Sequence, residues 1–535
     1  MTMVAEAMFG CSGSVADLPC APVLLEETLD YACNAAEQQN LPPLQISARH
    51  SKDPPPPWCT PKELSDHCRR IVADLRLGET PPTSSSFSFA QPIRWQPPPE
   101  GIVLVEIFGG IGTGLAAVLE AGITVRRYIH VDNGYAANRA VRHHIQQLLL
   151  RYPAQLSTSA ILGCCGQLPQ DVTMISDEDL RRLGHVDLII AGWPCQGHSR
   201  AGTGQGLDDP RSSLFADLIR LTQWWFTHQS TPPGYIFENV PLLGDTRHKV
   251  VKDGEYINQI LGTPTFLDAA ALGSYAHRPR WFWTNLVSPR VLSAAIACIP
   301  RLMDRKVDDI LDDHRVSLAV TKDDTLPFAL INKEGIPRGA LPTFVTYPQS
   351  FAFRSRGPGM VWDSQSQTYE EPTADERERA MGFLTGTTAA HGLQEGQRRF
   401  LLGQVMDLNS IVWIIGICLA AQQRMDDQLL SLRAENNGQG AMELQSKDHI
   451  EVNDIQGLFS LRQHVAEDLR VQRVFSALAQ EFEKMEAHKM FPLLFLGDTS
   501  YVGSYLATQT DCSGEHTHLD SSADDGGKGV ALSTD

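Results

Sequence analysis

The stretch GIVLVEIFGGIGTGLAAVLEAG, residues 101–122, changes the character of the chain and decides its fold. It opens with an apolar run, passes through a glycine-rich turn and ends in an apolar segment with helical spacing. An apolar run of this length predicts a buried strand. Glycines between a strand and a helix let a ligand approach the backbone closely. We therefore expect a strand–turn–helix unit with a ligand site at its turn, although a tight turn without a ligand is the simpler alternative.

Further predicted strands alternate with predicted helices. VRRYIHVD (125–132), VDLIIAG (186–192) and GYIFENV (234–240) are strand patterns, and RSSLFADLIRLTQWWFTH (211–228) is a helix pattern. This alternation predicts a largely parallel α/β sheet. Asp132, at the end of the second strand, suits a ribose diol, whereas the turn lacks the Lys-Ser/Thr pair of a phosphate loop. A nucleoside-bearing cofactor is expected, either S-adenosylmethionine or NAD.

The composition limits the classes of protein. The chain has 535 residues, 42% of them hydrophobic, and a formal net charge of −18, which argues against polyanion binding by the whole surface but allows a local basic cleft. Its 11 cysteines show no repeated Cys-x-x-Cys pairs, so we expect no metal site, no disulfide framework and a reducing compartment. We see no signal peptide, and the apolar stretch 411–421 is too short to span a bilayer, so we expect a buried helix and no membrane association.

Patterning divides the chain into six predicted regions. The first 100 residues are rich in Pro and Ser and mostly disordered, with a short helix over 61–77. Residues 101–285 form the cofactor-binding core, 286–371 a smaller unit, and 372–425 the end of the core. Thr373 and Glu376 have the spacing of a capping box at the start of that last part. A helical extension over 426–505 and a disordered tail over 506–535 complete the prediction.

A cysteine and a glutamate are predicted at the same edge of the sheet. Cys195, in AGWPCQGHSR (191–200), follows one predicted strand, and Glu238 lies at the end of the next. Ligands of open α/β sheets bind at the carboxyl ends of the strands. Taken alone, the cysteine is more simply a small buried residue and the glutamate a solvated loop acid. Together they predict a reactive cleft beside the cofactor turn.

Seven motifs in linear order make residues 101–421 resemble the DNA (cytosine-5)-methyltransferase family. They are FGGIGTG, the Pro-Cys-Gln loop in GWPCQGHS, GLDDPRSSLF (206–215), FENV (237–240), HRPRWFWTN (277–285), PTADERERAMGF (372–383) and LLGQVMDLNSI (401–411). Their details are most similar to the animal de novo type. The resemblance implies a Rossmann-like S-adenosylmethionine-dependent methyltransferase sheet, with helices on both faces and a small target-recognition subdomain over 286–371.

The resemblance also implies a covalent mechanism on a cytosine flipped out of DNA. Cys195 would attack carbon 6, and Glu238 would hold ring nitrogen 3 and the exocyclic amine. Arg280 would contact the carbonyl oxygen, while Arg278 would support the loop or a phosphate. The aromatic run WFW (281–283) is expected in the sheet core instead of stacking on a base.

The remaining site residues are carried over from the same motifs. The implied cofactor-binding residues are Phe108, Gly110, Ile111, Gly112, Thr113, Asp132, Asn133, Asp171, Val172, Pro194, Leu214 and Val405. The implied substrate-binding residues are Gln196, Ser199 and Asn239. Two further candidates, Arg354 and Arg356, come instead from TFVTYPQSFAFRSRGPG (343–359), where arginines among aromatic residues suit contact with the DNA backbone, although an ordinary strand pair is an equally good interpretation. The last motif departs from the family, because GQVMDLNSI lacks the Asn-Ser-Val that usually follows its glycine, and Val405 or Met406 is expected to line the cofactor pocket instead.

Two other functions stay open at this stage. An RNA cytosine-5 methyltransferase is one, although the Cys-Phe-Thr tripeptide of that branch is absent from the sequence. A catalytically inactive relative that binds and stimulates an active enzyme is the other, although the Pro-Cys and Glu-Asn-Val motifs are intact. The expected partners are DNA and a methyltransferase or chromatin protein, and the family implies a nuclear location.

Overall fold

The computed structural model describes residues 50–54, 60–73, 75, 89–200, 202–242, 245–300, 305–317, 339–346, 350–354 and 357–444. All of them belong to a unit that ends at Ser446. The predictions for residues 1–49 and for the tail over 506–535 lie outside the described residues, as does the extension beyond residue 444.

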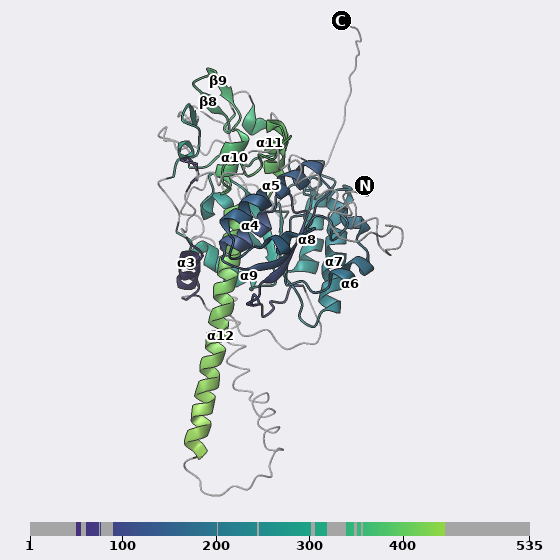
Figure 1. The fold of residues 1–535 in the computed structure, drawn as a ribbon, viewed down its shortest axis with the longest axis vertical. Helices are drawn as coiled ribbons and strands as arrows, with labels where there is room; N and C mark the ends of the chain where they lie inside the picture. Colours follow the sequence, from purple (N-terminus) through teal and green to yellow (C-terminus); the bar gives the residue numbers. More distant parts are fainter. Residues whose placement is uncertain are drawn as a thin grey trace, which may run out of the picture. The chain divides into compact units, whose positions relative to one another are not determined.

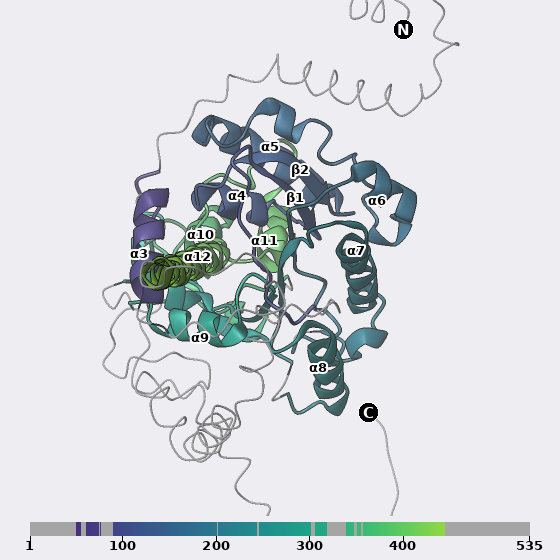
Figure 2. The same cartoon turned by 90° about the horizontal axis from the view of Figure 1, so that it is seen from below.

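Six strands form the central sheet in the order β2-β1-β3-β4-β6-β5 (Figures 1 and 2). They are β1 (Ile102–Ile107), β2 (Val125–Val131), β3 (Leu188–Ala191), β4 (Gly234–Asn239), β5 (Thr265–Asp268) and β6 (Pro279–Thr284). The pairs β2–β1, β1–β3 and β3–β4 are parallel, whereas β6 runs antiparallel to both β4 and β5. This sheet confirms the predicted Rossmann-like α/β fold.

Helices cover both faces of the sheet, as predicted (Figure 2). One hydrophobic core contains residues of α4 (Thr113–Glu120), α5 (Tyr135–Arg151), α9 (Pro289–Ala297) and α12 (Leu408–Leu444). The other contains residues of α6 (Asp177–Leu183), α7 (Phe215–His228) and α8 (His248–Leu261). Within β1, Leu104 faces the first core, and Val103 and Val105 face the second. A strand that is buried on both faces is apolar at nearly every position, which explains the apolar run that only Glu106 interrupts.

The topology brings five chain segments to one edge of the sheet. The parallel strands β1, β2, β3 and β4 all end there. Because β6 runs the opposite way, it begins there, with Trp281 paired to Asn239. The aromatic side chains Trp281, Phe282 and Trp283 are 8%, 2% and 1% exposed, as expected for sheet core.

A second, smaller sheet lies in the predicted target-recognition region. It consists of β7 (Arg315–Ser317), β8 (Val361–Asp363) and β9 (Thr368–Glu370). α10 (Ala374–Ala380) and α11 (Glu395–Gln404) follow, and α10 begins with the predicted capping box of Thr373 and Glu376. The division of the chain at residues 100, 285, 371, 425 and 505 stays a prediction.

The short 3-10 helices are η2 (Thr158–Ile161), η3 (Val172–Met174), η4 (Gly206–Asp208), η5 (Ser212–Leu214), η6 (Ala269–Leu272), η7 (Val307–Asp309) and η8 (Phe351–Phe353).

The apolar stretch 411–421 is a buried part of α12, as the sequence predicts. Glu395–Gln428 is long and apolar enough to cross a membrane by length and composition, but 83% of its most apolar window is buried inside the protein. α3 (Pro61–Ala73), the predicted N-terminal helix, packs on α12 with Leu64, Cys68 and Val72 buried. The packing is close, since a Cβ added at Gly416 would lie 2.8 Å from the Cys68 sulfur.

Candidate active site

Cys195 lies in the loop that follows β3, at the edge where the parallel strands end. Its thiol is free and the residue is partly buried. The Cys195 carbonyl accepts backbone N–H bonds from His198 (2.9 Å) and Ser199 (2.7 Å). The chain therefore turns tightly around the cysteine, which gives the thiol a defined position.

Glu238 and Arg280 form a buried ion pair beside this loop. Arg280 Nε lies 2.6 Å from Glu238 Oε1, and the two residues are 8% and 7% exposed. The antiparallel start of β6 brings the arginine to the end of β4. The second carboxylate oxygen lies against Gly192, where an added Cβ would be only 3.1 Å away. A glycine directly before the Cys195 loop thus leaves room for the carboxylate.

Arg278 is buried and incompletely paired. It is 4% exposed, and its Nε and Nη1 atoms have no hydrogen-bond partner among the described residues. Burial and the neighbouring Arg280 lower its pKa to about 10. Buried guanidinium donors are rarely left unpaired, so this arrangement offers hydrogen bonds to an incoming acceptor.

The charges around Cys195 act on its ionisation in opposite directions. Burial raises the pKa of the thiol, Arg280 and Arg278 lower it, and Glu238 raises it further. The net shift is upward, so the resting group at neutral pH is a thiol. The four predicted catalytic residues are therefore close enough for their charges to interact.

Two polar side chains fix the loop on both sides of the cysteine. Ser212 Oγ accepts the Gly197 N–H (2.9 Å) and donates to the Pro194 carbonyl (2.9 Å). Asn239 Nδ2 donates to the Trp193 carbonyl (3.0 Å), while its oxygen accepts the next backbone N–H (2.8 Å). Asn239 is thus a residue that holds the loop, and its contact with a substrate stays a prediction.

Residues at the start of α8 hold the rest of the loop. Arg247 Nη2 donates to the His198 carbonyl (2.5 Å), and Nη1 donates to the following carbonyl (3.1 Å). Asp253 accepts the Leu207 N–H (2.7 Å) and lies 3.5 Å from His198 Nε2. Gly206 has φ +61°, and a Cβ there would lie 1.8 Å from Asp253 Oδ2. The buried carboxylate therefore requires a glycine at this turn.

A buried carboxylate occupies the helix start behind the glycine-rich turn. Glu106 is fully buried and accepts the N–H groups of Gly114 (2.7 Å) and Leu115 (3.2 Å), together with the Tyr128 hydroxyl (2.9 Å). Burial raises its pKa. Backbone N–H groups at a helix N-terminus are those that bind phosphate in dinucleotide sites. Here Glu106 takes them, which disfavours NAD at this turn.

The turn itself has the backbone of a ligand cradle. Phe108, Gly110 and Gly112 have φ of 55°, 56° and 81°, in the left-handed region that favours glycine. Ile111 is fully buried beneath the turn. Thr113, at the start of α4, has a buried hydroxyl without a hydrogen-bond partner among the described residues. An unpartnered hydroxyl beside an open backbone turn fits a polar ligand.

Asp132 connects the turn to the next strand. Its Oδ2 accepts the Gly110 N–H (2.9 Å) and its Oδ1 the Gly134 N–H (2.8 Å). Asn133 beside it is exposed. Val405 approaches the same turn, since a Cβ on Gly110 would lie 3.4 Å from Val405 Cγ1. The predicted position of Val405 at the glycine turn therefore agrees with the geometry, despite the altered last motif.

The other predicted cofactor residues have no contact that ties them to a ligand. Asp171 is exposed and caps η3, because its side chain accepts the N–H (3.0 Å) and hydroxyl (2.7 Å) of Thr173. Val172 is buried, and Pro194 and Leu214 are partly buried. Their roles stay predictions.

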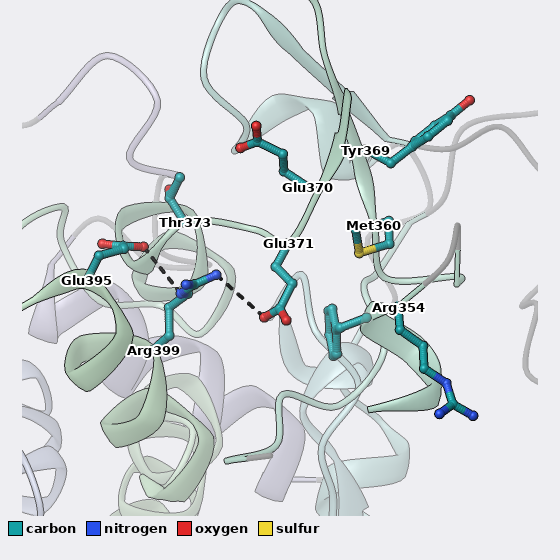
Figure 3. A pocket seen from close by; sticks show the side chains of 9 residues that line it. Arg354, Met360, Tyr369, Glu370, Glu371, Thr373, Glu395 and Arg399 are labelled. Atoms are coloured by element: carbon teal, nitrogen blue, oxygen red, sulfur yellow. Dashed lines mark ion pairs between the residues drawn. The ribbon is translucent and has the colours of Figure 1, made fainter. Parts of the chain in front are cut away.

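The predicted substrate residues fall into two places. Gln196 and Ser199 lie on the Cys195 loop, and the side-chain oxygen of Gln196 is buried with no hydrogen-bond partner among the described residues. Arg354 instead lines a pocket of about 790 Å³ near β9 and α11, together with Glu371 and other glutamates (Figure 3). In Figure 3 its guanidinium points away from Glu371. Arg356 lies outside the described residues.

Four residues with clear roles are not predicted from the sequence. A lone charge in an apolar strand could have marked Glu106, and Ser212 lies within a quoted motif. Nothing in the sequence pairs Arg247 or Asp253 with the loop. Met406, which the sequence offers as the alternative to Val405, lies against Gly192, with its sulfur 3.7 Å from the position of an added Cβ. No group of three His, Cys, Asp or Glu able to hold a metal ion occurs in the part of the chain that the structure describes.

Comparison with known proteins matches residues 166–286 to the family model of C-5 cytosine-specific DNA methylases. This segment contains the Cys195 loop, Glu238 and both arginines. The Dnmt2 methyltransferase of S. pombe superposes with a TM-score of 0.40 at 17% identity, over 59% of this chain and 98% of that one. The Entamoeba histolytica methyltransferase EhMeth gives 0.37 at 14%, over 59% and 98%.

Curated relatives align over shorter segments. The type II methyltransferase M.HgiCII of Herpetosiphon aurantiacus is 44% identical over 71 residues, 13% of this chain and 15% of that protein. M.CviJI of Paramecium bursaria Chlorella virus IL3A is 33% identical over 114 residues (21% and 29%), and M.DdeI of Desulfomicrobium norvegicum 31% over 144 residues (25% and 32%). The chain thus aligns with less than a third of the length of each of these relatives. Residues 166–286 are thus similar to the C-5 cytosine-specific DNA methylases.

Proposed function

We propose that this protein is a DNA methyltransferase that transfers a methyl group from S-adenosylmethionine to carbon 5 of a flipped cytosine, through a covalent adduct with Cys195. The observation that carries the proposal is the position of Cys195, on a loop fixed from both sides, beside the buried Glu238–Arg280 pair. A fixed nucleophile beside paired acid and base groups is the arrangement that covalent catalysis needs.

The glycine-rich turn fits S-adenosylmethionine. This cofactor has no phosphate, which agrees with a helix start already occupied by Glu106. Thr113 and the turn Phe108–Thr113 would hold its methionine end, and Asp132 its ribose. When bound, the cofactor supplies an electrophilic methyl group. Val405 would close the turn from the side of the last motif.

The protein's own groups account for activation of the base. The Cys195 thiol loses its proton and attacks carbon 6, and Arg278 and Arg280 stabilise the thiolate because both lower its pKa. Glu238 binds nitrogen 3 and the exocyclic amine, so that the ring accepts the electron pair and carbon 5 becomes nucleophilic. The free donors of Arg278 are available to the substrate. Loss of the proton from methylated carbon 5 then expels the cysteine.

The test is a covalent trap. DNA containing 5-fluorocytosine is incubated with the protein and S-adenosylmethionine, and the products are separated on a denaturing gel. Because fluorine cannot leave as the proton does, an active enzyme stays bonded to the DNA. We expect a cofactor-dependent shifted band that is absent in Cys195→Ala and present in Cys298→Ser, an exposed cysteine that serves as the matched control.

Absence of the band would contradict the proposal. If the protein still bound S-adenosylmethionine, the same trap with 5-fluorocytosine RNA would separate an RNA enzyme from an inactive partner of another methyltransferase. The likeness to the animal de novo type, the additional methyltransferase or chromatin partner and the nuclear location are parts of the same proposal, and localisation of a tagged full-length chain tests the last.

A further inference from the structure

A pair of adjacent cysteines forms the tip of a glycine-flanked turn. Cys164 and Cys165 lie between Gly163 and Gly166, and the Gly166 N–H donates to the Gly163 carbonyl (2.8 Å). The two sulfur atoms are 3.7 Å apart. Both glycines are exposed, Cys165 is partly buried and Cys164 is buried. Small reagents can therefore reach the turn from the solvent side.

A buried histidine lies against these thiols. His130, on β2, is fully buried, and neither ring nitrogen has a hydrogen-bond partner of standard geometry among the described residues. The His130 ring interacts with the Cys165 thiol, and the backbone N–H of His130 donates to the Cys164 carbonyl (2.9 Å). Buried imidazole nitrogens without partners are rare, so a neighbouring thiol that can ionise gives this ring a counter-charge.

The surroundings separate the two thiols in acidity. The pKa of Cys165 lies well below the usual value, because Cys164 donates a hydrogen bond to it and because His130 and Arg142 place positive charge nearby. The same hydrogen bond raises the pKa of Cys164. Burial lowers the pKa of His130, but Cys165, Glu106 and Asp132 together leave it raised.

The histidine connects this turn to the glycine-rich turn. A Cβ added at Gly109 would lie 2.5 Å from His130 Cδ2, so the ring fills all of the space beside that backbone. Gly109 directly precedes Gly110, and its N–H donates to the Val131 carbonyl (3.2 Å). A group attached to Cys165 cannot move His130 without moving this backbone.

We propose that the turn Gly163–Gly166 is a thiol-modification site, at which Cys165 reacts as a thiolate with disulfides of small thiols and thereby weakens ligand binding at the neighbouring glycine-rich turn. The Cys165 sulfur attacks one sulfur of the incoming disulfide, forming a mixed disulfide. The other sulfur leaves as a thiolate and takes a proton from water. A second thiol reverses the reaction.

A disulfide between the two cysteines is the less favourable product. Adjacent α-carbons are about 3.8 Å apart across a trans peptide, whereas disulfides need about 4.4–6.8 Å. The sulfur atoms would also have to approach from 3.7 Å. The mixed disulfide requires neither change, because it forms a bond to Cys165 alone.

The test compares two cysteines within one protein. The full chain is treated with oxidised glutathione at pH 6, and the modified peptides are quantified by mass spectrometry over time. We expect Cys165 to react at least about tenfold faster than Cys298, which is more exposed but lacks the His130 and Cys164 neighbours. An equal or slower rate at Cys165 would overturn the thiol site.

Two variants of Cys164 test whether its hydrogen bond makes Cys165 reactive. Cys164→Ser keeps a hydroxyl donor and should keep the fast reaction, whereas Cys164→Ala should lose most of the advantage. Slow reaction in both, or fast reaction in both, would contradict the proposed role of the hydrogen bond.

The effect of Cys165 modification on ligand binding rests on the proposed function, because it is measured with S-adenosylmethionine. Calorimetric titration with S-adenosylmethionine should show at least about fivefold weaker binding after modification, with affinity restored by dithiothreitol and with no effect of the treatment in Cys165→Ser. Equal affinity before and after modification would overturn the coupling. A protein that bound no cofactor in either state would count against the proposed function, and the ratio of reaction rates would still decide the thiol site.

Discussion

Replacing Glu238 with Gln should change two properties of the site in opposite directions. The carboxylate lies 2.6 Å from Arg280 Nε and raises the pKa of Cys195, whereas Arg280 lowers it. Removing the negative charge leaves the arginine to act on the thiol without opposition. A fall of about one pKa unit, or about 1.4 kcal/mol, increases the thiolate fraction about tenfold at a pH below the pKa. Methyl transfer should fall about 100-fold or more, because the base loses its charged partner.

The assay is alkylation of Cys195 by iodoacetamide at pH 7 in the absence of DNA, followed by peptide mapping. Glu238→Gln should react up to about tenfold faster than the unmodified protein, and Arg280→Gln should react more slowly. Breaking a buried ion pair costs about 3–5 kcal/mol. The glutamine can still accept from Arg280, so we expect a loss of unfolding free energy near the lower end. Alkylation of Glu238→Gln at or below the unmodified rate would refute the electrostatic account of the site.

Three further predictions concern the support of the site. Asp132→Ala removes the acceptor of two glycine N–H groups and should weaken S-adenosylmethionine binding at least about tenfold in calorimetric titration; an unchanged dissociation constant would contradict the cofactor assignment. Gly206→Ala places a Cβ 1.8 Å from Asp253 Oδ2 and should lower turnover while the affinity for the cofactor is retained. The control Gly184→Ala, where an added Cβ meets no atom within 4 Å, should have a much smaller effect. Equal effects of the two substitutions would argue against the role of Asp253 in holding the Cys195 loop. Burial raises the pKa of Asp407 from 3.8 to about 6, so the folded state binds this proton more tightly than the unfolded state. Protonated Asp407 therefore contributes about 3 kcal/mol to the free energy of unfolding below pH 4, and this contribution is lost as the pH rises through 6. Urea denaturation between pH 4 and 7 should show a smaller loss in Asp407→Asn, and parallel curves would exclude the assignment.

Local patterns were sufficient for the elements that carry the site. The run after Gly101 predicted β1, the turn and α4, because a strand buried on both faces is largely apolar and a helix must begin after the glycines. Thr373 and Glu376 predicted the start of α10, since a capping box involves only residues three apart. The order of the predicted strands was also sufficient to place Cys195 and Glu238 at one edge of the sheet.

Contacts between distant segments were beyond the sequence. The Arg280–Glu238 pair depends on the reversed direction of β6, which no local pattern encodes. The apolar face of α3 indicated burial but not that α12 covers it. The aromatic neighbours of Arg354 predicted a DNA contact, which stays a prediction, but not that Arg354 would line a pocket with Glu370, Glu371 and other charged residues.

The unpaired donors of Arg278 and the buried thiol of Cys195 have the same energetic consequence for the empty site. Two buried guanidinium donors of Arg278, which have no hydrogen-bond partner in the described part of the chain, cost the folded protein about 1–3 kcal/mol each. The Cys195 thiol nearby is likewise held, by burial, in its less reactive form. The cost of the unpaired Arg278 donors and the cost of ionising Cys195 both decrease when a thiolate or a substrate carbonyl oxygen lies close to Arg278. A site that is destabilised at rest and stabilised by the charge of the reaction favours the reacting state over the empty one, which is the condition for catalysis by a preorganised environment.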